Sequence, residues 1–361
     1  MIQKTWQAAT DKAVFDAINQ HKVTKDEILN LFFSRKVIVS KKTDKDELAN
    51  EFSSFFHSFH DYDILSTILG VNNRKEKLTS YSLETSLKVS DVEGSIQKIK
   101  NEIMDQGATV KHNVLNGGKK IEMLITYQVL NLSKNDFQQI SIRDAVLTIE
   151  ETGSGLDIRH PQNKKLSDIS DIVVDVLESK DKSLLKDEIE LSAFDKPKDR
   201  TLFFDFLTKG IDGFICKDVT DTYVFNPSKK VTSGETNEVH ITSASLKGTG
   251  VNLSEELKSL HEQGFYTWRV IWKAVKEDTD SSDLYVFEAQ FSDAEECKDF
   301  SFIVKGSYKR KNEGVVGDVS GHNVNRTPVS PIEEERLNKL INKSARNAIK
   351  NLSDIYNTQG D

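Results

Sequence analysis

The spacing of apolar residues divides the chain into a helical first part and a longer part built mostly from strands. Up to Gly70 the apolar residues recur every three or four positions, which is the period of an amphipathic helix. From Ser80 onward apolar and polar residues alternate, which is the period of a half-buried strand. The polar segment Asn72–Lys77 separates the two patterns, so we predict a helical N-terminal domain over residues 1–78. Its helices are expected over 5–21, 24–32, 43–59 and 63–69.

The alternating region begins with a unit of strands and two helices over residues 80–180. The sequence Asn116-Gly117-Gly118 between two alternating segments is a strong signal for a hairpin turn. Strands are predicted over 82–89, 108–115, 120–130, 140–150 and 156–160, and helices over 90–107 and 167–178.

A second unit of the same kind is expected over residues 239–357, after a mostly helical insert over 181–238. Near its end, Ser330-Pro331 followed by Glu333 marks a helix start, because serine caps, proline suits the first position and glutamate suits the third. The apolar stripe of this helix, from Leu337 to Tyr356, is expected to pack on the second sheet. The remaining predicted elements are strands over 239–247, 265–277, 283–291 and 300–309, and a helix over 254–261.

We therefore assign the chain to the α+β class: a helical N-terminal domain followed by two antiparallel-sheet units with a helical insert between them. Both units follow the element order β-α-β-β-β-(β)-α, although their sequences share no visible identity. The pattern leaves open whether the units are duplicates or unrelated. The element order resembles each half of the TATA-binding protein fold, in which a concave sheet bends DNA and inserts phenylalanines. This resemblance implies either a DNA saddle or a scaffold for a protein partner.

Charge is unevenly distributed along the chain. The net charge of −8 excludes a protein that is basic throughout. Residues 1–80 carry 12 basic and 11 acidic groups and residues 300–361 carry 10 and 7, so the middle of the chain has a net charge of −12. This acidic middle favours a scaffold over a DNA saddle. We expect nucleic acid to meet the ends of the chain, and a basic protein partner or a second copy of the chain to meet the middle.

Cysteine content and the length of apolar runs favour a cytoplasmic protein. Cys216 and Cys297 form neither a CxxC pair nor a disulfide framework. The longest apolar runs, such as Leu31-Phe32-Phe33, span a few residues, whereas a membrane-spanning helix needs about 20. The N-terminal segment Met1–Trp6 lacks the apolar core of a signal peptide. We expect no association with a membrane.

The segment Thr24–Phe52 joins two short amphipathic helices by an extended connection rich in basic residues. Its apolar positions are Ile28, Leu29, Leu31 and Phe32 in the first helix, Val37 and Val39 in the connection, and Leu48 and Phe52 in the second helix. This pattern resembles the helix–extended loop–helix family to which SAP DNA-binding modules belong, which usually has a glycine where Arg35 and Lys36 stand here. The resemblance implies that amides at the start of the second helix face phosphate, together with basic side chains.

The DNA-binding residues assigned on this basis are Arg35, Lys36, Lys41, Lys42 and Lys45. The same turn also contains Asp44, Asp46 and Glu47. The alternative is a plain helical domain whose charged rim is only solvated.

Two clusters that contain histidine are candidates for metal binding or proton transfer. His57 and His60 are spaced to share one helix face, near two aspartates, but aromatic residues interleave with them as at the edge of a core. Asp157 and Arg159 are expected to project from one face of a strand and to pair, next to His160. No nucleophile motif accompanies His160, so a structural role is favoured in both clusters.

One predicted strand carries acidic residues in an order similar to that of metal-dependent nucleases. Those enzymes place an aspartate on one strand and Glu-x-Lys on a later one, whereas here Asp283 precedes Glu288-x-Gln290 on a single strand. A metal ion needs converging oxygen ligands, which one strand does not supply. The glycine clusters 153–155 and 248–250 lack phosphate-loop and dinucleotide motifs and predict turns.

These observations favour a non-enzymatic DNA-binding or DNA-sensing accessory protein with an acidic body for protein contacts. Multidomain proteins of this kind fit a microbial conflict with phage or plasmid. The alternatives are a divergent metal-dependent nuclease and a pure assembly scaffold. We assign no catalytic residue, no metal ligand and no cofactor.

Overall fold

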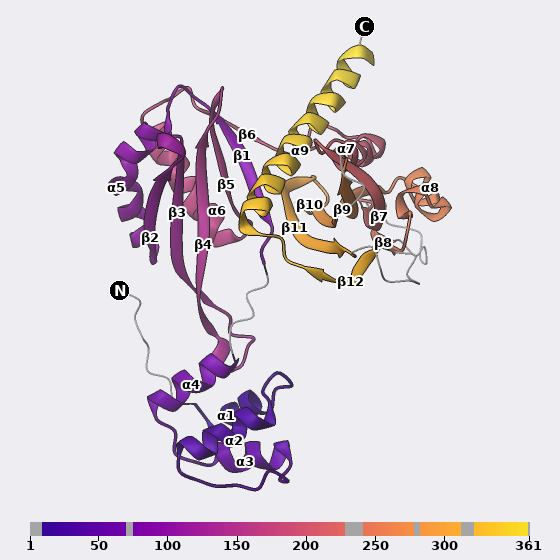
Figure 1. Ribbon diagram of the computed structural model, residues 1–361. Coiled ribbons are helices and arrows are strands. Elements are labelled where there is room, and N and C mark those ends of the chain that lie inside the picture. The colour runs from indigo at the N-terminus through magenta and orange to yellow at the C-terminus, as the bar shows by residue number, and fades with distance from the viewer. Residues whose placement is uncertain (1–8, 70–74, 228–240, 278–281, 312–320, 360–361) are drawn as a thin grey trace, which may run out of the picture.

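The computed structural model describes residues 9–69, 75–227, 241–277, 282–311 and 321–359. In this part of the chain there are nine α-helices and one antiparallel sheet of twelve strands, which confirms the α+β class. Figure 1 shows a group of N-terminal helices beneath the sheet and a long C-terminal helix that runs across it. The N-terminal helices are α1 (Asp11–Ile18), α2 (Lys25–Ser34), α3 (Lys45–Ser53) and α4 (Phe59–Leu69).

Side-chain caps determine where the first helices begin. Thr10 accepts a hydrogen bond from the amide of Ala13 at α1, and Thr24 and Glu27 form a reciprocal capping box at α2. The helix expected over 43–59 ends early, at Ser53 of α3, and the helix expected over 63–69 begins early, at Phe59 of α4. The hydroxyls of Ser53 and Ser54 donate to carbonyls of the last turn of α3, which competes with continuation of the helix.

The first strands and helices of the sheet follow the predicted order. They are β1 (Leu78–Glu84), α5 (Val89–Asp105), β2 (Ala108–Leu115), β3 (Lys120–Leu130), β4 (Ile140–Glu151), β5 (Gly155–Pro161) and α6 (Lys164–Glu178). The apolar face of this sheet packs against α5 and α6 in one core. The predicted hairpin turn between β2 and β3 is confirmed, since Asn116 and Gly117 have φ angles of 52° and 63°.

The remaining elements complete a second layered unit. They are β6 (Leu185–Glu188), α7 (Pro197–Lys209), β7 (Phe214–Phe225), β8 (Ser243–Lys247), α8 (Glu255–Glu262), β9 (Tyr266–Lys276), β10 (Leu284–Asp293), β11 (Lys298–Arg310), β12 (His322–Thr327) and α9 (Pro331–Gln359). One face of β9, β10 and β11 packs against α7 and α9.

The prediction of a mostly helical insert over 181–238 is wrong in the part that the structure describes. Only α7 is helical there, and it is flanked by β6 and by the twelve-residue strand β7. Shifts of register between β7 and β9 interrupt the alternation of apolar and polar residues in β7, which concealed this strand in the sequence. Residues 228–238 of the predicted insert lie outside the described residues.

All twelve strands belong to one continuous sheet. Ten of them follow the order β2-β3-β4-β5-β1-β11-β10-β9-β7-β8, while β6 pairs with β1 and β12 pairs with β11. In the first unit the first strand, β1, pairs with the last strand, β5. In the second unit β7 pairs with β9 and the last long strand, β11, meets β1. The similar element order is therefore not accompanied by the same strand order in the two units.

The N-terminal helices share their core with the tip of a hairpin from the sheet. The connection between β3 and β4 contains a short 3-10 helix, Asp136–Gln138, and Phe137 from it is only 4% exposed among the residues of the helical domain. Tyr62 of α4 stacks on Phe137 with ring centroids 4.7 Å apart. The hydroxyl of Ser66 donates to the carbonyl of Phe137. One aromatic ring thus ties the helical domain to the sheet.

The C-terminal helix α9 begins at Pro331, as predicted, and packs on the part of the sheet that belongs to the second unit. Its stripe of Leu337, Ile341, Ala345 and Leu352 is buried against β10, β11 and α7. Its polar side faces the first unit, where Lys339 pairs with Glu150 at 2.6 Å. The helix therefore spans the junction of the two units (Figure 1).

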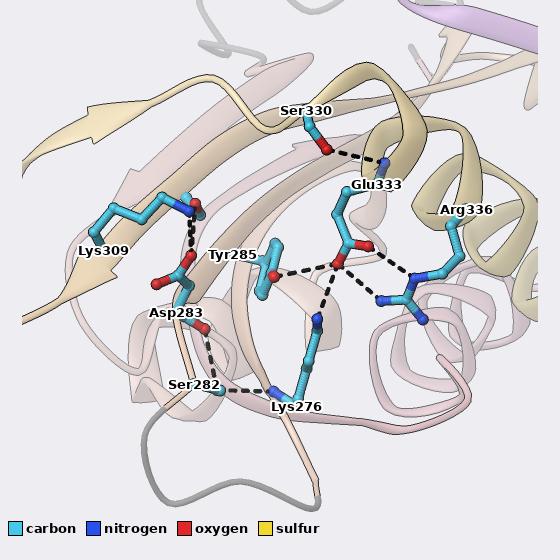
Figure 2. Close-up of polar contacts among 9 residues, drawn as sticks. Lys276, Ser282, Asp283, Tyr285, Lys309, Ser330, Glu333 and Arg336 are labelled. Atoms are coloured by element: carbon cyan, nitrogen blue, oxygen red, sulfur yellow. Dashed lines mark hydrogen bonds and ion pairs between the residues drawn. The ribbon is translucent and has the colours of Figure 1, made fainter.

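Glu333 anchors the first turn of α9 to the sheet. Figure 2 shows its carboxylate between Lys276, Tyr285 and Arg336. Arg336 donates from two nitrogens at 2.9 and 3.0 Å, and Lys276 lies at 3.1 Å. The hydroxyl of Ser330 accepts a hydrogen bond from the amide of Glu333, so Ser330 is the helix cap, as predicted. Hydrogen bonds from Arg336, followed by those from Lys276, outweigh burial and lower the pKa of Glu333 to about 2.

We predict that Phe137→Ala loosens the helical domain far more than the sheet. Deleting a buried phenylalanine side chain typically removes about 3 kcal/mol or more. Hydrogen exchange of α1 to α4 should therefore accelerate while β9 to β11 stay protected. Leu132→Ala in the same connection is the matched control, because Leu132 is 72% exposed. Equal exchange in the two variants would contradict the shared core.

We also predict that Glu333→Gln destabilises the protein in a pH-dependent way. Because the folded pKa of Glu333 is depressed from 4.5 to about 2, its stabilisation is complete above about pH 4.5 and disappears as the pH falls through 2. The loss at pH 7 should be on the order of 2 kcal/mol, and urea unfolding should show it shrinking from pH 5 to pH 3. Glu256→Gln, in the exposed first turn of α8, is the control and should change little. A pH-independent loss would contradict the assignment.

Candidate nucleic-acid interface

The connection between α2 and α3 begins with a sharp turn at the end of α2. The amide of Lys36 donates a hydrogen bond to the carbonyl of Phe33, and the amide of Val37 donates one to the carbonyl of Phe32. This pair of bonds is a Schellman motif, whose turning residue lies in the left-handed region and is usually glycine. Here the turning residue is Lys36, with a φ of 62°. A lysine therefore occupies the position at which a Schellman motif usually has glycine, at a strain of roughly 1 kcal/mol.

Arg35 is held inside the domain rather than presented to a ligand. Its guanidinium pairs with Asp61 at 2.6 Å, donates to the carbonyl of Phe56 and contacts the ring nitrogen of His57 at 3.2 Å. It also lies over the ring of Phe52, 5.4 Å from the centroid. These contacts join the end of α2 to the start of α4, so Arg35 is a structural residue.

Lys45 is also used internally. Its ammonium group donates to the carbonyl of Gln20 at 2.6 Å and to that of Asn19 at 3.4 Å. These carbonyls follow the C-terminal end of α1, where a positive charge is favourable. Lys45 therefore fixes α3 against α1 and has little capacity left for phosphate.

Lys36, Lys41 and Lys42 remain exposed on the loop. Among the described residues none of the three makes an ion pair, and the ammonium group of Lys36 only approaches the ring of Phe33 at 6.0 Å. Ser40 closes the turn that carries Lys41 and Lys42. Its hydroxyl accepts a hydrogen bond from the amide of Lys42, and its carbonyl accepts one from the amide of Thr43. The loop thus presents three lysines on an ordered backbone.

The same part of the domain exposes apolar side chains that the sequence analysis did not single out. Ile38 is 89% exposed between the inward-facing Val37 and Val39, and Phe33 and Phe56 are also largely exposed. The alternation of inward and outward residues over 37–39 is the signal that identifies Ile38. These side chains extend the loop surface beyond its charges.

The two histidine clusters have structural surroundings. His57 contacts Arg35 and the carbonyl of Phe52, and its burial, followed by the charge of Arg35, lowers its pKa. His60 is exposed on α4. His160 is buried against Tyr81, and its burial lowers its pKa.

Asp157 and Arg159 share a strand face, as predicted, but each has another partner. Asp157 accepts a hydrogen bond from Ser82, and Arg159 lies 3.8 Å from Glu335 of α9. The expected pairing between Asp157 and Arg159 is therefore not observed.

The nuclease-like residues do not converge. Asp283 bonds to Lys309 on the side of the sheet where Tyr285 faces α9, as Figure 2 shows. Glu288 points to the opposite face, where Lys77, Arg269 and Lys305 surround its carboxylate at 2.7, 2.9 and 2.7 Å. Within the described residues no group of three or more histidine, cysteine or acidic side chains is placed to hold a metal ion. The arrangement binds cations of the protein itself.

The sequence matches no protein-family model and no curated protein. Among the helices of the described residues, none combines the length and apolar character needed to cross a membrane. The candidate interface therefore stands on the geometry of the loop alone.

We predict that Arg35 and Lys41 respond differently to the same substitution. Arg35→Gln removes the ion pair with Asp61 and the contact with the ring of Phe52 at the edge of the core. It should lower the free energy of unfolding by about 2 kcal/mol. Lys41→Gln should change stability by less than about 0.5 kcal/mol, because the side chain is exposed and unpaired. Thermal unfolding followed by circular dichroism measures both. Equal melting temperatures would show that Arg35 is not a structural clamp.

Proposed function

We propose that this protein is a non-enzymatic DNA-binding protein that contacts phosphate groups through the loop between α2 and α3. The observation that carries the proposal is the presence of three unpaired lysines, Lys36, Lys41 and Lys42, on a loop held in place from both ends. Arg35 clamps one end and Lys45 the other. A ligand surface that is ordered before binding loses less conformational entropy when it binds.

The strained backbone of Lys36 supports this proposal. A left-handed conformation at a non-glycine residue persists only where surrounding structure enforces it, and such residues concentrate at functional sites. The conformation places an exposed charge at the end of α2, at the point where the chain leaves the helix. The benefit of that charge to a ligand complex would explain why glycine does not occupy the position.

The chemistry of the loop favours phosphate over bases. Its exposed basic side chains are lysines, which act as point charges for phosphate, whereas base recognition relies mainly on arginine, asparagine and glutamine. Asp44, Asp46 and Glu47 lie on the α3 side of the loop and repel phosphate there. The DNA backbone would therefore approach from the side of Lys36 to Lys42, and sequence preference would be weak.

The acidic middle of the chain supports a second part of the proposal, a body that contacts a protein partner or another copy of the chain. A DNA-binding accessory protein of this kind would act in the cytoplasm. A scaffold that does not bind DNA is the second candidate, and the exposed Phe33, Ile38 and Phe56 favour it. On that alternative the loop would bind a protein through its apolar residues.

We predict that the full-length protein binds duplex DNA with a log–log salt slope near −3, because about three phosphates are neutralised. The affinity should then fall about fiftyfold between 50 and 200 mM salt. Lys36→Gln, Lys41→Gln and Lys42→Gln combined should abolish this binding for all sequences. Electrophoretic shift or fluorescence anisotropy on an arbitrary duplex measures the effect.

The control carries the same change of net charge at Lys98, Lys258 and Lys298, which are exposed elsewhere on the molecule. It should retain binding. Lys36→Gly is a sharper single variant, because it should raise stability by up to about 1 kcal/mol while weakening DNA binding. If the folded parent protein shows no shift at low salt, or if the control loses binding as the loop variant does, the proposal is wrong.

A further inference from the structure

In the second unit, one face of the sheet formed by β7, β9, β10 and β11 is not covered by a helix of the described residues. Trp272, Phe287 and Phe302 point from β9, β10 and β11 into the core with α7 and α9. Strand alternation directs Arg269, Glu288 and Lys305 to the other face. Long basic and aromatic side chains lie across that face: Tyr223 on β7, Trp268, Arg269 and Lys273 on β9, and Lys305 and Tyr308 on β11.

Positive charge exceeds negative charge on this face. Five cations, from Lys77, Lys247, Arg269, Lys273 and Lys305, accompany three carboxylates, from Asp218, Asp221 and Glu288.

Three of the five cations share the single buried carboxylate of Glu288. Burial, followed by the charges of Arg269 and Lys305, lowers the pKa of Lys77 although Glu288 lies beside it. Lys273 makes no ion pair among the described residues. The charge of the face is therefore incompletely neutralised within the protein.

Aromatic rings are interleaved with these cations. The guanidinium of Arg269 lies 4.3 Å from the centre of the Tyr223 ring, and Lys273 lies 5.8 Å from that of Tyr308. Trp268 packs edge-on to Tyr223 at 6.0 Å and is the additional residue of a β-bulge, since Tyr223 pairs with Arg269 and Val224 with Thr267. All three rings are partly exposed.

From this arrangement we propose that the open face of β7, β9, β10 and β11 binds single-stranded DNA, with phosphates at Lys273 and Lys305 and bases against Tyr223 and Tyr308. Aromatic rings on a basic sheet surface are the combination that binds unpaired nucleic acid, because every base offers a flat π face and duplex DNA hides those faces. Tyr223 is on β7 and Tyr308 is on β11, and β9 and β10 lie between these two strands. The bound DNA would therefore run across the sheet. The proposal rests on the proposed function for its ligand class, but its residues are different.

The test is fluorescence anisotropy of the full-length protein with a labelled 15-nucleotide thymidine oligomer. Tyr223→Leu with Tyr308→Leu removes both rings but keeps apolar bulk, and should weaken binding by on the order of tenfold for each ring. Tyr223→Phe with Tyr308→Phe keeps the rings and should bind within about twofold of the parent. Lys273→Gln should weaken binding and make the salt slope shallower by about 0.7.

The combined loop variant of Lys36, Lys41 and Lys42 separates this proposal from the proposed function. It should lose duplex binding and retain the oligomer on the sheet. If the leucine and phenylalanine pairs bind the oligomer equally, or if only the loop variant loses it, the sheet proposal is overturned while duplex binding by the loop stands. If duplex binding survives in the loop variant, the proposed function fails and the sheet result is unaffected.

A second measurement does not depend on the stability of the leucine pair. Trp272 is fully buried, whereas Trp268 lies on the proposed surface. Because the chain has a third tryptophan, Trp6, the titration uses Trp6→Phe protein as the parent. The oligomer should quench its tryptophan fluorescence, and adding Trp268→Phe should remove most of that change while anisotropy still reports binding. Quenching of the same size in Trp268→Phe would overturn the proposal.

Discussion

Burial of the apolar stripe of α9 is the interaction on which the arrangement of the two sheet units depends. β1 and β11 meet at a single register pair, Leu78 with Phe302, so backbone pairing between these two strands contributes little. Leu337 and Ile341 of α9 are fully buried in the second core, and each contributes roughly 2 kcal/mol. On the polar side of the same helix, Asn342 accepts a hydrogen bond from Ser80 of β1. One helix thereby completes a core and bridges to the neighbouring unit.

Ion pairs orient the two units relative to each other. Glu335 of α9 forms an ion pair with Lys120 of β3. Glu288 of β10 forms one with Lys77, which directly precedes β1. A partly buried ion pair adds little net stability, because desolvation opposes the attraction of the charges. Breaking it leaves a buried charge without its partner, which disfavours any other alignment. These pairs therefore specify how the two units meet more than how strongly they adhere.

Short-range signals made several elements predictable from the sequence. The start of α9 has its cap, proline and glutamate at positions 330, 331 and 333, and the hairpin turn before β3 has residues suited to the left-handed conformation. The failures involve contacts between distant segments. β7 was missed because its bulges break the alternation, and Phe137 gave no sign that it completes a core with α1 and α4. Strand order depends on which distant edges pair, which local periodicity does not contain.

The candidate site was predictable to a similar depth. The sequence located the basic loop. It did not distinguish lysines that face solvent from basic residues that bond to other groups of the protein. Arg35 and Lys45 differ from Lys41 only in the carbonyls, rings and carboxylate that the fold places beside them. The basic face of β7, β9, β10 and β11 could not be predicted for a related reason. Tyr223, Lys273 and Tyr308 are separated by up to 85 positions and share a face only through the register of β7, β9 and β11.

If the loop binds a polyanion as proposed, the net charge of −8 restricts the attraction to short distances. At physiological ionic strength electrostatic interactions between exposed charges decay over about 8 Å, so acidic groups farther away than this contribute little at the loop. At low salt the decay length grows, and the acidic middle of the chain then repels the same polyanion. Lowering the salt therefore strengthens local attraction and distant repulsion together. Below about 50 mM salt the affinity for DNA would therefore rise less steeply than the number of contacted phosphates implies. Above about 50 mM, screening isolates the loop from the acidic groups, and the slope reports the full number of contacts.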